Sequence, residues 1–313
     1  MLRFPLRVDI FFEILSEKHA ASDFDPDAVL VLHCKTERHK LGHTDGVTTN
    51  ALFTIEDNHF VPSEFTRGPW RADAQHGGPP SALLGSVTDP LVDANEVLAH
   101  IEVELVAPVP LTPLYVTAER VQVSGRVHRV HALMYAGGSD QALVARSNAV
   151  VLRASDIADP EWAPATTLAV DPPSEDHLVE PPRWASGDVT TYHRNAVEHR
   201  FTGGDFRIPG PAVDWQRLRG PVIEGQEPSP LERVLAAADF GSGISAVYGA
   251  TSGFGLINAN LCVSLVRPLE GEWVSLDAVT HVGPASGLGI TTLGDTRGQI
   301  GIATQSLLGY RMH

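Results

Sequence analysis

The apolar and polar positions of the chain become periodic from residue 51 onwards. Ile101, Val103 and Leu105 alternate with acidic residues, which is typical of a strand with one buried face. Further upstream, Gly77 and Gly78 mark a turn, and the two prolines that follow suit the first turn of a helix. After a strand at 51–57, the first half therefore predicts one helix and four antiparallel strands. We expect them at 81–88 (the helix body), 100–108, 115–123, 126–136 and 142–153.

The same order of elements returns in the second half of the chain. An apolar helix is expected from Leu231 to about Tyr248, and the triplet at 106–108 has its counterpart 160 residues later, at 266–268. One helix followed by four strands, twice over, predicts a duplicated α+β unit whose two sheets can pair into one surface. The strands of this second copy are expected at 256–268, 273–282, 288–295 and 300–311.

Changes in composition divide the chain. Residues 1–48 carry mixed charge and scattered histidines without a lasting period, so we expect a poorly ordered extension there; Asp9 and Glu13 interrupt its apolar patch, which disfavours a signal peptide. A segment rich in Pro, Asp and Glu is the expected linker. The predicted boundaries are 49–153 for the first unit, 154–195 for the linker and 196–313 for the second unit.

The overall charge restricts the partners. The 313 residues carry a formal net charge of -15 with a pI near 5.3. Nucleic acid and anionic membranes bind basic faces, so both are disfavoured, although a local basic cluster could still hold an anionic ligand. Cys34 and Cys262 lie far apart and form no ligand spacing, which favours a reducing, cytoplasmic compartment and no metal. No apolar run approaches the roughly 20 residues that span a bilayer.

Asp239 is the first candidate for chemistry, because an acid inside an apolar helix costs free energy unless it has a use. The alternative is that it points outward or caps a neighbouring segment. Gln305 shares a strand face with Ala303, although it could also be an ordinary exposed glutamine. Asn258 and Asn260 are two residues apart, so a regular strand would turn both the same way and make them rivals for one role.

The segment His76-Gly77-Gly78 is the second candidate. Free amides at a helix start can polarise a carbonyl or receive an anion, whereas the plainer interpretation is that glycine lets backbones pass closely. His76 as a general base is a further, less favoured interpretation. The chain has no GxSxG, HExxH, P-loop or GxGxxG motif in a suitable context, which disfavours the corresponding hydrolase, protease and nucleotide-binding classes.

Several segments together resemble a known family. WRADAQHGGPPSALL in the first half, and PLERVLAAADFGSG, NANLCVSLVRPL and DTRGQIGIATQSLLGYR in the second, are similar to the type II acyl-CoA thioesterases of the thioesterase-like superfamily. The resemblance covers about residues 51–311. It implies a tandem (double) hotdog, in which two long helices are each wrapped by an antiparallel sheet. It also implies hydrolysis of an acyl-CoA thioester to the free acid and CoA, without a cofactor.

The resemblance also implies roles for particular residues. The family's water-orienting aspartate and glutamine fall on Asp239 and Gln305, while the position of its hydroxyl residue falls on Asn258, a departure from the pattern. Ser147 is the first-half counterpart of Gln305, and the first helix has no aspartate, so one site per chain is expected. Substrate-binding roles are expected for Trp70, His76, Gly77, Gly78 and Asn260, with Arg71 beside Trp70 at a pocket mouth or on a CoA phosphate.

Two other functions stay open. The fold could hold an acyl or acyl-CoA ligand without cleaving it, since Asn258 replaces a hydroxyl residue. It could also serve only to support an oligomer, and a homo-oligomer is expected in any case because a sheet edge is exposed. A hotdog hydratase is disfavoured, because the histidine expected after the aspartate is missing from the segment that follows Asp239.

Overall fold

The computed structural model describes residues 11–14, 30–35, 50–137, 141–155, 157, 171–182, 187–249 and 252–311. Its helices are α1 (Gly78–Thr88), α2 (Pro230–Ala238) and α3 (Gly241–Ile244). The strands of the first half are β1 (Phe11–Ile14), β2 (Leu30–Lys35), β3 (Phe53–Glu56), β4 (His59–Pro62), β5 (Glu96–Leu105), β6 (Leu114–Gln122), β7 (Val127–Ala136) and β8 (Ala142–Arg153). Those of the second half are β9 (Val197–Asp205), β10 (Ile208–Leu218), β11 (Phe254–Asn258), β12 (Asn260–Leu265), β13 (Val274–Val282), β14 (Gly287–Asp295) and β15 (Gly298–Arg311).

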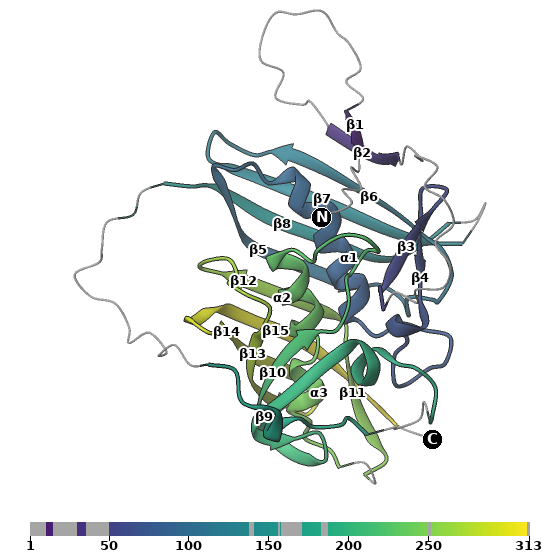
Figure 1. Cartoon of the computed structure of the whole chain (residues 1–313), viewed down its shortest axis with the longest axis vertical. Coiled ribbons are helices and arrows are strands. Elements are labelled where there is room, and N and C mark those ends of the chain that lie inside the picture. Colours follow the sequence, from purple (N-terminus) through teal and green to yellow (C-terminus); the bar gives the residue numbers. More distant parts are fainter. Residues whose placement is uncertain are drawn as a thin grey trace, which may run out of the picture.

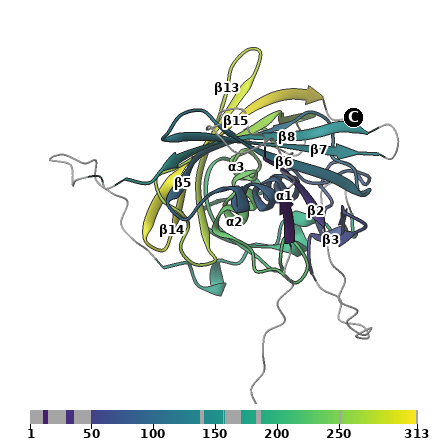
Figure 2. The same ribbon diagram turned by 90° about the horizontal axis from the view of Figure 1, so that it is seen from above.

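The strands of the described residues form one antiparallel sheet that encloses the helices. Its main path runs β1-β2-β6-β7-β8-β5-β12-β15-β14-β13-β10-β9, and the halves join where β5 pairs with β12, Val103 opposite Leu261. In Figure 1 the blue and teal strands of the first half continue into the green and yellow strands of the second. Figure 2 shows α1, α2 and α3 inside the curve of the sheet. The predicted α+β double hotdog with one continuous surface is confirmed.

Alternation along the strands builds the core. In β7, every second side chain from His128 to Ala136 is buried, and the residues between them are less so. Ile101 and Val103 of β5 are fully buried, as their period predicts. Helix α1 is apolar on all sides, and ten of its eleven residues are buried. A helix of this kind needs cover all round, which the sheet and α2 provide.

The two long helices pack against each other in opposite directions. The start of α1 lies beside the end of α2, since a Cβ built on Gly78 would be 2.6 Å from the carbonyl oxygen of Ala236. One built on Gly85, two turns later on the same face, would be 2.9 Å from Leu235 Cδ1. Gly78 therefore allows a backbone approach that a larger residue would prevent, and Gly85 leaves room for the side chain of Leu235.

Helix α2 is shorter than expected. It begins with a capping box, in which Ser229 Oγ accepts from the Glu232 amide and Glu232 accepts from the Ser229 amide. Instead of continuing to about residue 248, it ends at Ala238, and the four-residue α3 follows. The carbonyl of Asp239 accepts a hydrogen bond from the side chain of Gln305 at 3.0 Å, so a strand replaces the next helical turn as its partner.

Five strands, β1, β2, β4, β9 and β10, were not predicted. β9 and β10 precede α2 as β3 and β4 precede α1, but Gly203-Gly204 and Pro209-Gly210-Pro211 obscure their period. In the expected extension, residues 1–10, 15–29 and 36–49 lie outside the described part; between them β1 and β2 form strands, and β2 pairs with β6. The boundaries at 49–153, 154–195 and 196–313 stay predictions.

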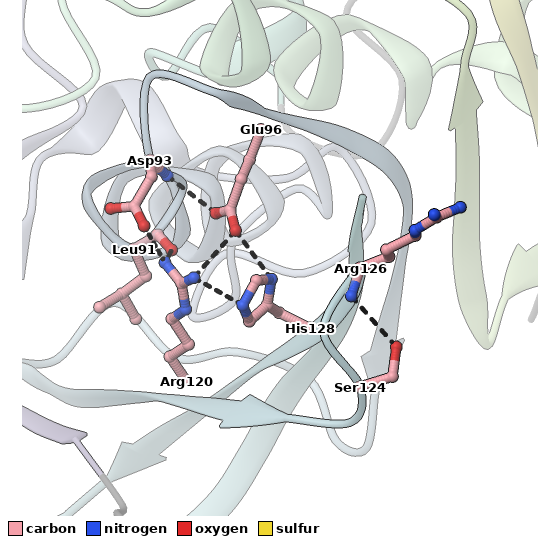
Figure 3. Close-up of polar contacts among 7 residues, drawn as sticks. All are labelled: Leu91, Asp93, Glu96, Arg120, Ser124, Arg126 and His128. Carbon is pink, nitrogen blue, oxygen red and sulfur yellow. Dashed lines mark hydrogen bonds and ion pairs between the residues drawn. The ribbon is translucent and has the colours of Figure 1, made fainter. Parts of the chain in front are cut away.

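A polar cluster closes the first half at the far end of α1 (Figure 3). Arg120 of β6 contacts Glu96 of β5 at 2.9 Å and His128 of β7 at 2.7 Å, and donates to the carbonyl of Leu91 at 3.1 Å. His128 Nδ1 lies 2.8 Å from the same Glu96 carboxylate. Because β5 and β6 are not neighbours in the sheet, these contacts tie its inner face together across the end of the helix.

A second cluster joins the end of α1 to the start of α2. Ser229 Oγ donates to the Asp89 carboxylate, and Ser86 Oγ donates to that of Glu232. Burial raises the pKa of Asp89 to about 6, against the lowering effect of Ser229, and the charge of Glu232 raises it further. Burial also raises the pKa of Glu232. Both carboxylates are thus harder to ionise in the folded chain than in the unfolded one.

This predicts that Asp89→Asn stabilises the protein at neutral pH. The folded chain binds the Asp89 proton more tightly than the unfolded chain, whose pKa is near 3.8, so the free energy of unfolding falls as pH rises from about 4 to about 6. The variant lacks this fall and should be more stable than the parent by about 1–3 kcal/mol at pH 7 and equal at pH 4. Urea unfolding at both pH values measures it. The exposed Asp277→Asn is the control, and an unchanged or lowered stability of Asp89→Asn at pH 7 would contradict the prediction.

Candidate active site

A cavity of about 340 Å³ lies between the two halves, beside the start of α1 and the end of α2. Its walls are mainly apolar and include Val109, Phe206, Leu256 and Leu308, while one end is polar. The polar end is formed by His76, Asp239 and Asn258. A hollow of about 450 Å³ on the outer face of the first-half sheet is lined by charged side chains and contains none of the expected site residues.

Asp239 is the centre of the polar end. Asn258 Nδ2 donates to its Oδ1 at 2.7 Å, and His76 Nδ1 lies 2.9 Å from its Oδ2. The side chain of Asp239 is 3% exposed and that of His76 is 13% exposed. A buried carboxylate is costly unless it has polar partners, and here Oδ1 accepts from Asn258 while Oδ2 faces the His76 ring. The structure therefore brings together Asp239, Asn258 and His76, three residues from three separate segments.

Gly77 makes room for the Asp239 carboxylate. A Cβ built on Gly77 would lie 2.7 Å from both carboxylate oxygens, closer than atoms of this kind approach. The plainer interpretation of the glycine pair, close passage of the backbone, thus accounts for both glycines: Gly77 faces Asp239, and Gly78 faces Ala236 and Tyr192. Gly77 also lines the cavity, and among the described residues its N–H group has no hydrogen-bond partner.

Gln305 reaches Asp239 through the backbone. It is 2% exposed; its Nε2 donates to the Asp239 carbonyl at 3.0 Å and its Oε1 accepts from the Ser242 amide at 2.9 Å. It therefore holds the turn between α2 and α3 in place and makes no contact with the carboxylate. Ser147, its first-half counterpart, is also buried, and its hydroxyl has no hydrogen-bond partner within the described ranges.

Asn260 does not join the cluster, which corrects the expectation that it faces the same way as Asn258. Asn258 pairs with Leu307 of β15, and Cys262 pairs with Thr304 of the same strand. The chain therefore advances by four residues from Asn258 to Cys262 while β15 advances by only three. A slip of one residue turns the following side chains to the opposite face of the sheet. Asn260 Nδ2 accordingly contacts Glu102 at 3.1 Å, away from the cavity.

Two aromatic residues that the pattern did not single out hold the ring of His76. The ring centroids of Tyr192 and Phe240 lie 5.1 Å and 4.6 Å from that of His76. Tyr192 is fully buried in the π-helical turn Tyr192–Ala196, and its hydroxyl donates to the Ala236 carbonyl at 2.9 Å. Burial and the charge of Asp239 raise the pKa of Tyr192 well above 10, so it stays a neutral donor. Its place in the expected linker concealed it, whereas Phe240 directly follows Asp239.

A buried acid–histidine pair lies behind Phe240. His199 Nδ1 contacts Asp214 Oδ2 at 2.7 Å, and its ring meets the ring of Phe240 edge-on at 5.0 Å. The neighbouring His193 is neutral, because burial, helped by His76 and His199, lowers its pKa to about 3. Alternation along β9 marks His199 as inward-facing once that strand is recognised.

Trp70, for which a substrate-binding role is expected, lines the cavity and is 49% exposed. Arg71 beside it is exposed and pairs with Asp73 at 2.8 Å.

Within the described ranges, no three His, Cys, Asp or Glu side chains are grouped to hold a metal ion. No helix in this part of the chain is long and apolar enough to cross a membrane.

Two family profiles match the chain. The acyl-CoA thioesterase N-terminal domain matches residues 66–154, and the acyl-CoA thioesterase C-terminal domain matches residues 171–308. The chain belongs to the acyl-CoA thioesterase family. The join between its two matched domains lies in the segment that precedes the turn carrying Tyr192, and each domain contributes to the cavity. No curated protein sequence matches the chain.

Solved structures share the family's fold with this chain. A hotdog-fold protein of unknown function from Alicyclobacillus acidocaldarius is 12% identical, with a TM-score of 0.58 over 82% of this chain and 93% of that one. The tesB protein of Mycobacterium avium subs paratuberculosis is 13% identical, with a TM-score of 0.54 over 80% and 92%. An acyl-CoA thioesterase II from Mycobacterium marinum is 14% identical, with a TM-score of 0.52 over 77% and 92%. At these identities the likeness shows the fold alone.

The packing at Gly78 predicts that Gly78→Ala destabilises the fold. The added methyl group would lie 2.6 Å from the Ala236 carbonyl oxygen and 2.8 Å from the ring of Tyr192, so the two helices must separate. We expect a loss of about 1–3 kcal/mol in the free energy of unfolding, measured by urea denaturation. Gly125→Ala, where the methyl group meets nothing within 4 Å, is the matched control. Equal midpoints for the two variants would contradict the prediction.

Proposed function

We propose that the protein hydrolyses an acyl-CoA or related acyl thioester to the free acid and a thiol. The observation that carries this proposal is the buried Asp239, held by Asn258 and His76 at the polar end of a mainly apolar cavity. An apolar cavity suits an acyl chain, and a small set of polar groups at one end suits the thioester carbonyl. Membership of the acyl-CoA thioesterase family supports the reaction class.

The cavity suggests where each part of the substrate lies. The acyl group would occupy the apolar walls near Phe206 and Leu308, with the thioester carbonyl at Asp239. Gly77 directly precedes α1 and lines the cavity, and its N–H, free within the described part of the chain, would be a donor for the developing oxyanion. Trp70 and Arg71 at the cavity would contact the CoA moiety. Gln305 would act by fixing the backbone of Asp239, and no metal or redox cofactor is required.

Thiol release from a panel of acyl-CoAs of increasing chain length tests the proposal. We expect turnover that rises and falls with chain length, because the cavity is finite. Asp239→Asn should lower kcat/KM by about 10²–10⁴-fold, since it removes the charge on which water activation depends. Failure to turn over any chain length, or full activity in Asp239→Asn, would contradict the mechanism.

A matched pair of asparagine variants refines the same assay. Asn258→Ala removes a hydrogen bond to the buried carboxylate and should lower kcat/KM by roughly 10–100-fold. Asn260→Ala, two residues along the chain but outside the cavity, should leave kcat/KM within about threefold, as a change away from the reacting groups does. Equal losses in the two variants would remove Asn258 from the site.

The second candidate function is an acyl- or acyl-CoA-binding protein without turnover. The presence of an amide, Asn258, where the family has a hydroxyl residue favours it. Native mass spectrometry with acyl-CoA, run beside the thiol-release assay, separates the two functions. A stable complex without thiol release would favour binding alone.

The assembly and the compartment are also proposals. We expect a homo-oligomer, because the sheet path ends at β9 and an open sheet edge invites pairing; sedimentation as a monomer would contradict it. A cytoplasmic location fits the free thiol of Cys262, the one cysteine whose side chain the structure describes.

A further inference from the structure

His76 presents one ring nitrogen to Asp239 and the other to the cavity. Nδ1 lies 2.9 Å from Asp239 Oδ2, while Nε2 has no hydrogen-bond partner among the described residues. This unpaired nitrogen is not fully buried, and His76 lines the cavity. Nε2 therefore has access to whatever occupies the polar end.

The contact with Asp239 decides which nitrogen carries the proton. An ionised carboxylate only accepts hydrogen bonds, so Nδ1 must be the N–H group. The N–H group of Gly78 also points at Nδ1 from 3.1 Å, with the geometry of a hydrogen-bond donor to that nitrogen. If Nδ1 accepted from that amide, it would carry a lone pair and no proton. Its lone pair would then repel those of Asp239 Oδ2, which is closer (2.9 Å) than the Gly78 amide (3.1 Å), so this arrangement is less favourable. In the favoured tautomer, Nε2 is an unprotonated base.

The Asp239 carboxylate itself is poorly placed to receive a proton from water. Oδ1 accepts from Asn258, Oδ2 faces His76, and Gly77 covers both oxygens so closely that no Cβ fits between them. Only 3% of the side chain is exposed. Imidazole, in contrast, is the side chain that exchanges protons most readily near neutral pH.

We infer that His76 is the general base of the proposed thioester hydrolysis, with Asp239 as the group that orients and stabilises it. This assignment rests on the proposed function and names the atom, Nε2, that receives the proton. A water molecule gives its proton to Nε2, and the electron pair of the broken O–H bond forms the bond to the thioester carbon. The carbonyl π pair moves to oxygen. When the carbonyl re-forms, the C–S bond breaks with its pair on sulfur, and the imidazolium returns its proton to the thiolate.

The surroundings of His76 keep its ring ready for this role. Tyr192 and Phe240 flank the ring, and His199, anchored by Asp214, holds Phe240 from behind. These contacts restrict the rotation of the ring, so that Nε2 need not be reoriented when substrate arrives. The histidine comes from the first half of the chain and the acid from the second, so the dyad exists only when the halves are packed together.

The decisive variant is His76→Asn. The Asn side-chain amide can place an N–H where Nδ1 stands and so keep the hydrogen bond to Asp239, but it has nothing in the place of Nε2. In the thiol-release assay we expect kcat to fall by about 10²–10⁴-fold while KM changes by less than about threefold. His281→Asn, the same change at an exposed histidine, should leave kcat and KM unchanged, and urea unfolding checks that both variants are folded.

His76→Ala provides a second readout that a positioning role would not produce. The deletion leaves space between Tyr192 and Phe240, and added imidazole should restore turnover, with rates that rise with the basicity of substituted imidazoles. The assignment would be overturned if His76→Asn kept the kcat of the wild-type protein, or if no imidazole raised the turnover of His76→Ala. In either case, turnover by the wild-type protein would leave the proposed function intact. Absence of turnover in the wild-type protein would overturn both.

Discussion

The close antiparallel packing of α1 against α2 is the constraint on which the rest of the structure depends. Gly78 has no side chain where it meets the backbone of Ala236, and Gly85 leaves room for the side chain of Leu235, so the two helices approach closely. This places the start of α1 directly against the end of α2. His76, Gly77 and Asp239 meet there for that reason, although the histidine and the acid belong to different halves of the chain. A wider helix pair would move His76 away from Asp239.

Duplication explains why the site is asymmetric. The two halves repeat the same order of elements, and their sheets join through β5 and β12 into one surface. Their inner polar residues have nevertheless diverged. The second half supplies Asp239 and its supports, Asn258 and Gln305, whereas the first half supplies the loop with His76 and leaves Ser147 buried in the position that corresponds to Gln305. The cavity between the halves is thus lined by different polar residues from each copy.

The polar groups inside the sheet have distinct physical tasks. The cluster around Arg120 and Glu96 ties strands that are not neighbours through contacts between protein groups alone. Asp89 pairs with a hydroxyl group and keeps a raised pKa, which lowers stability at neutral pH. Asp239 differs from both because its partner His76 has a second nitrogen directed at a cavity. Burial alone does not mark a functional acid; burial beside a partner with access to a ligand does.

The sequence by itself determined the duplicated order of helix and strands, because alternation and helical period report directly which residues face a core. It also identified Asp239 as a candidate, because an acid in an apolar helix is conspicuous, while Gln305 became a candidate through the family resemblance. Only the tertiary structure decided how they act. A slip of one residue between β11 and β12 sent Asn260 to the outer face, which no period reveals, since a period assigns faces only along an unbroken strand. The meeting of His76 with Asp239 depends on how closely two helices pack, and that distance is set by contacts between residues far apart in the chain.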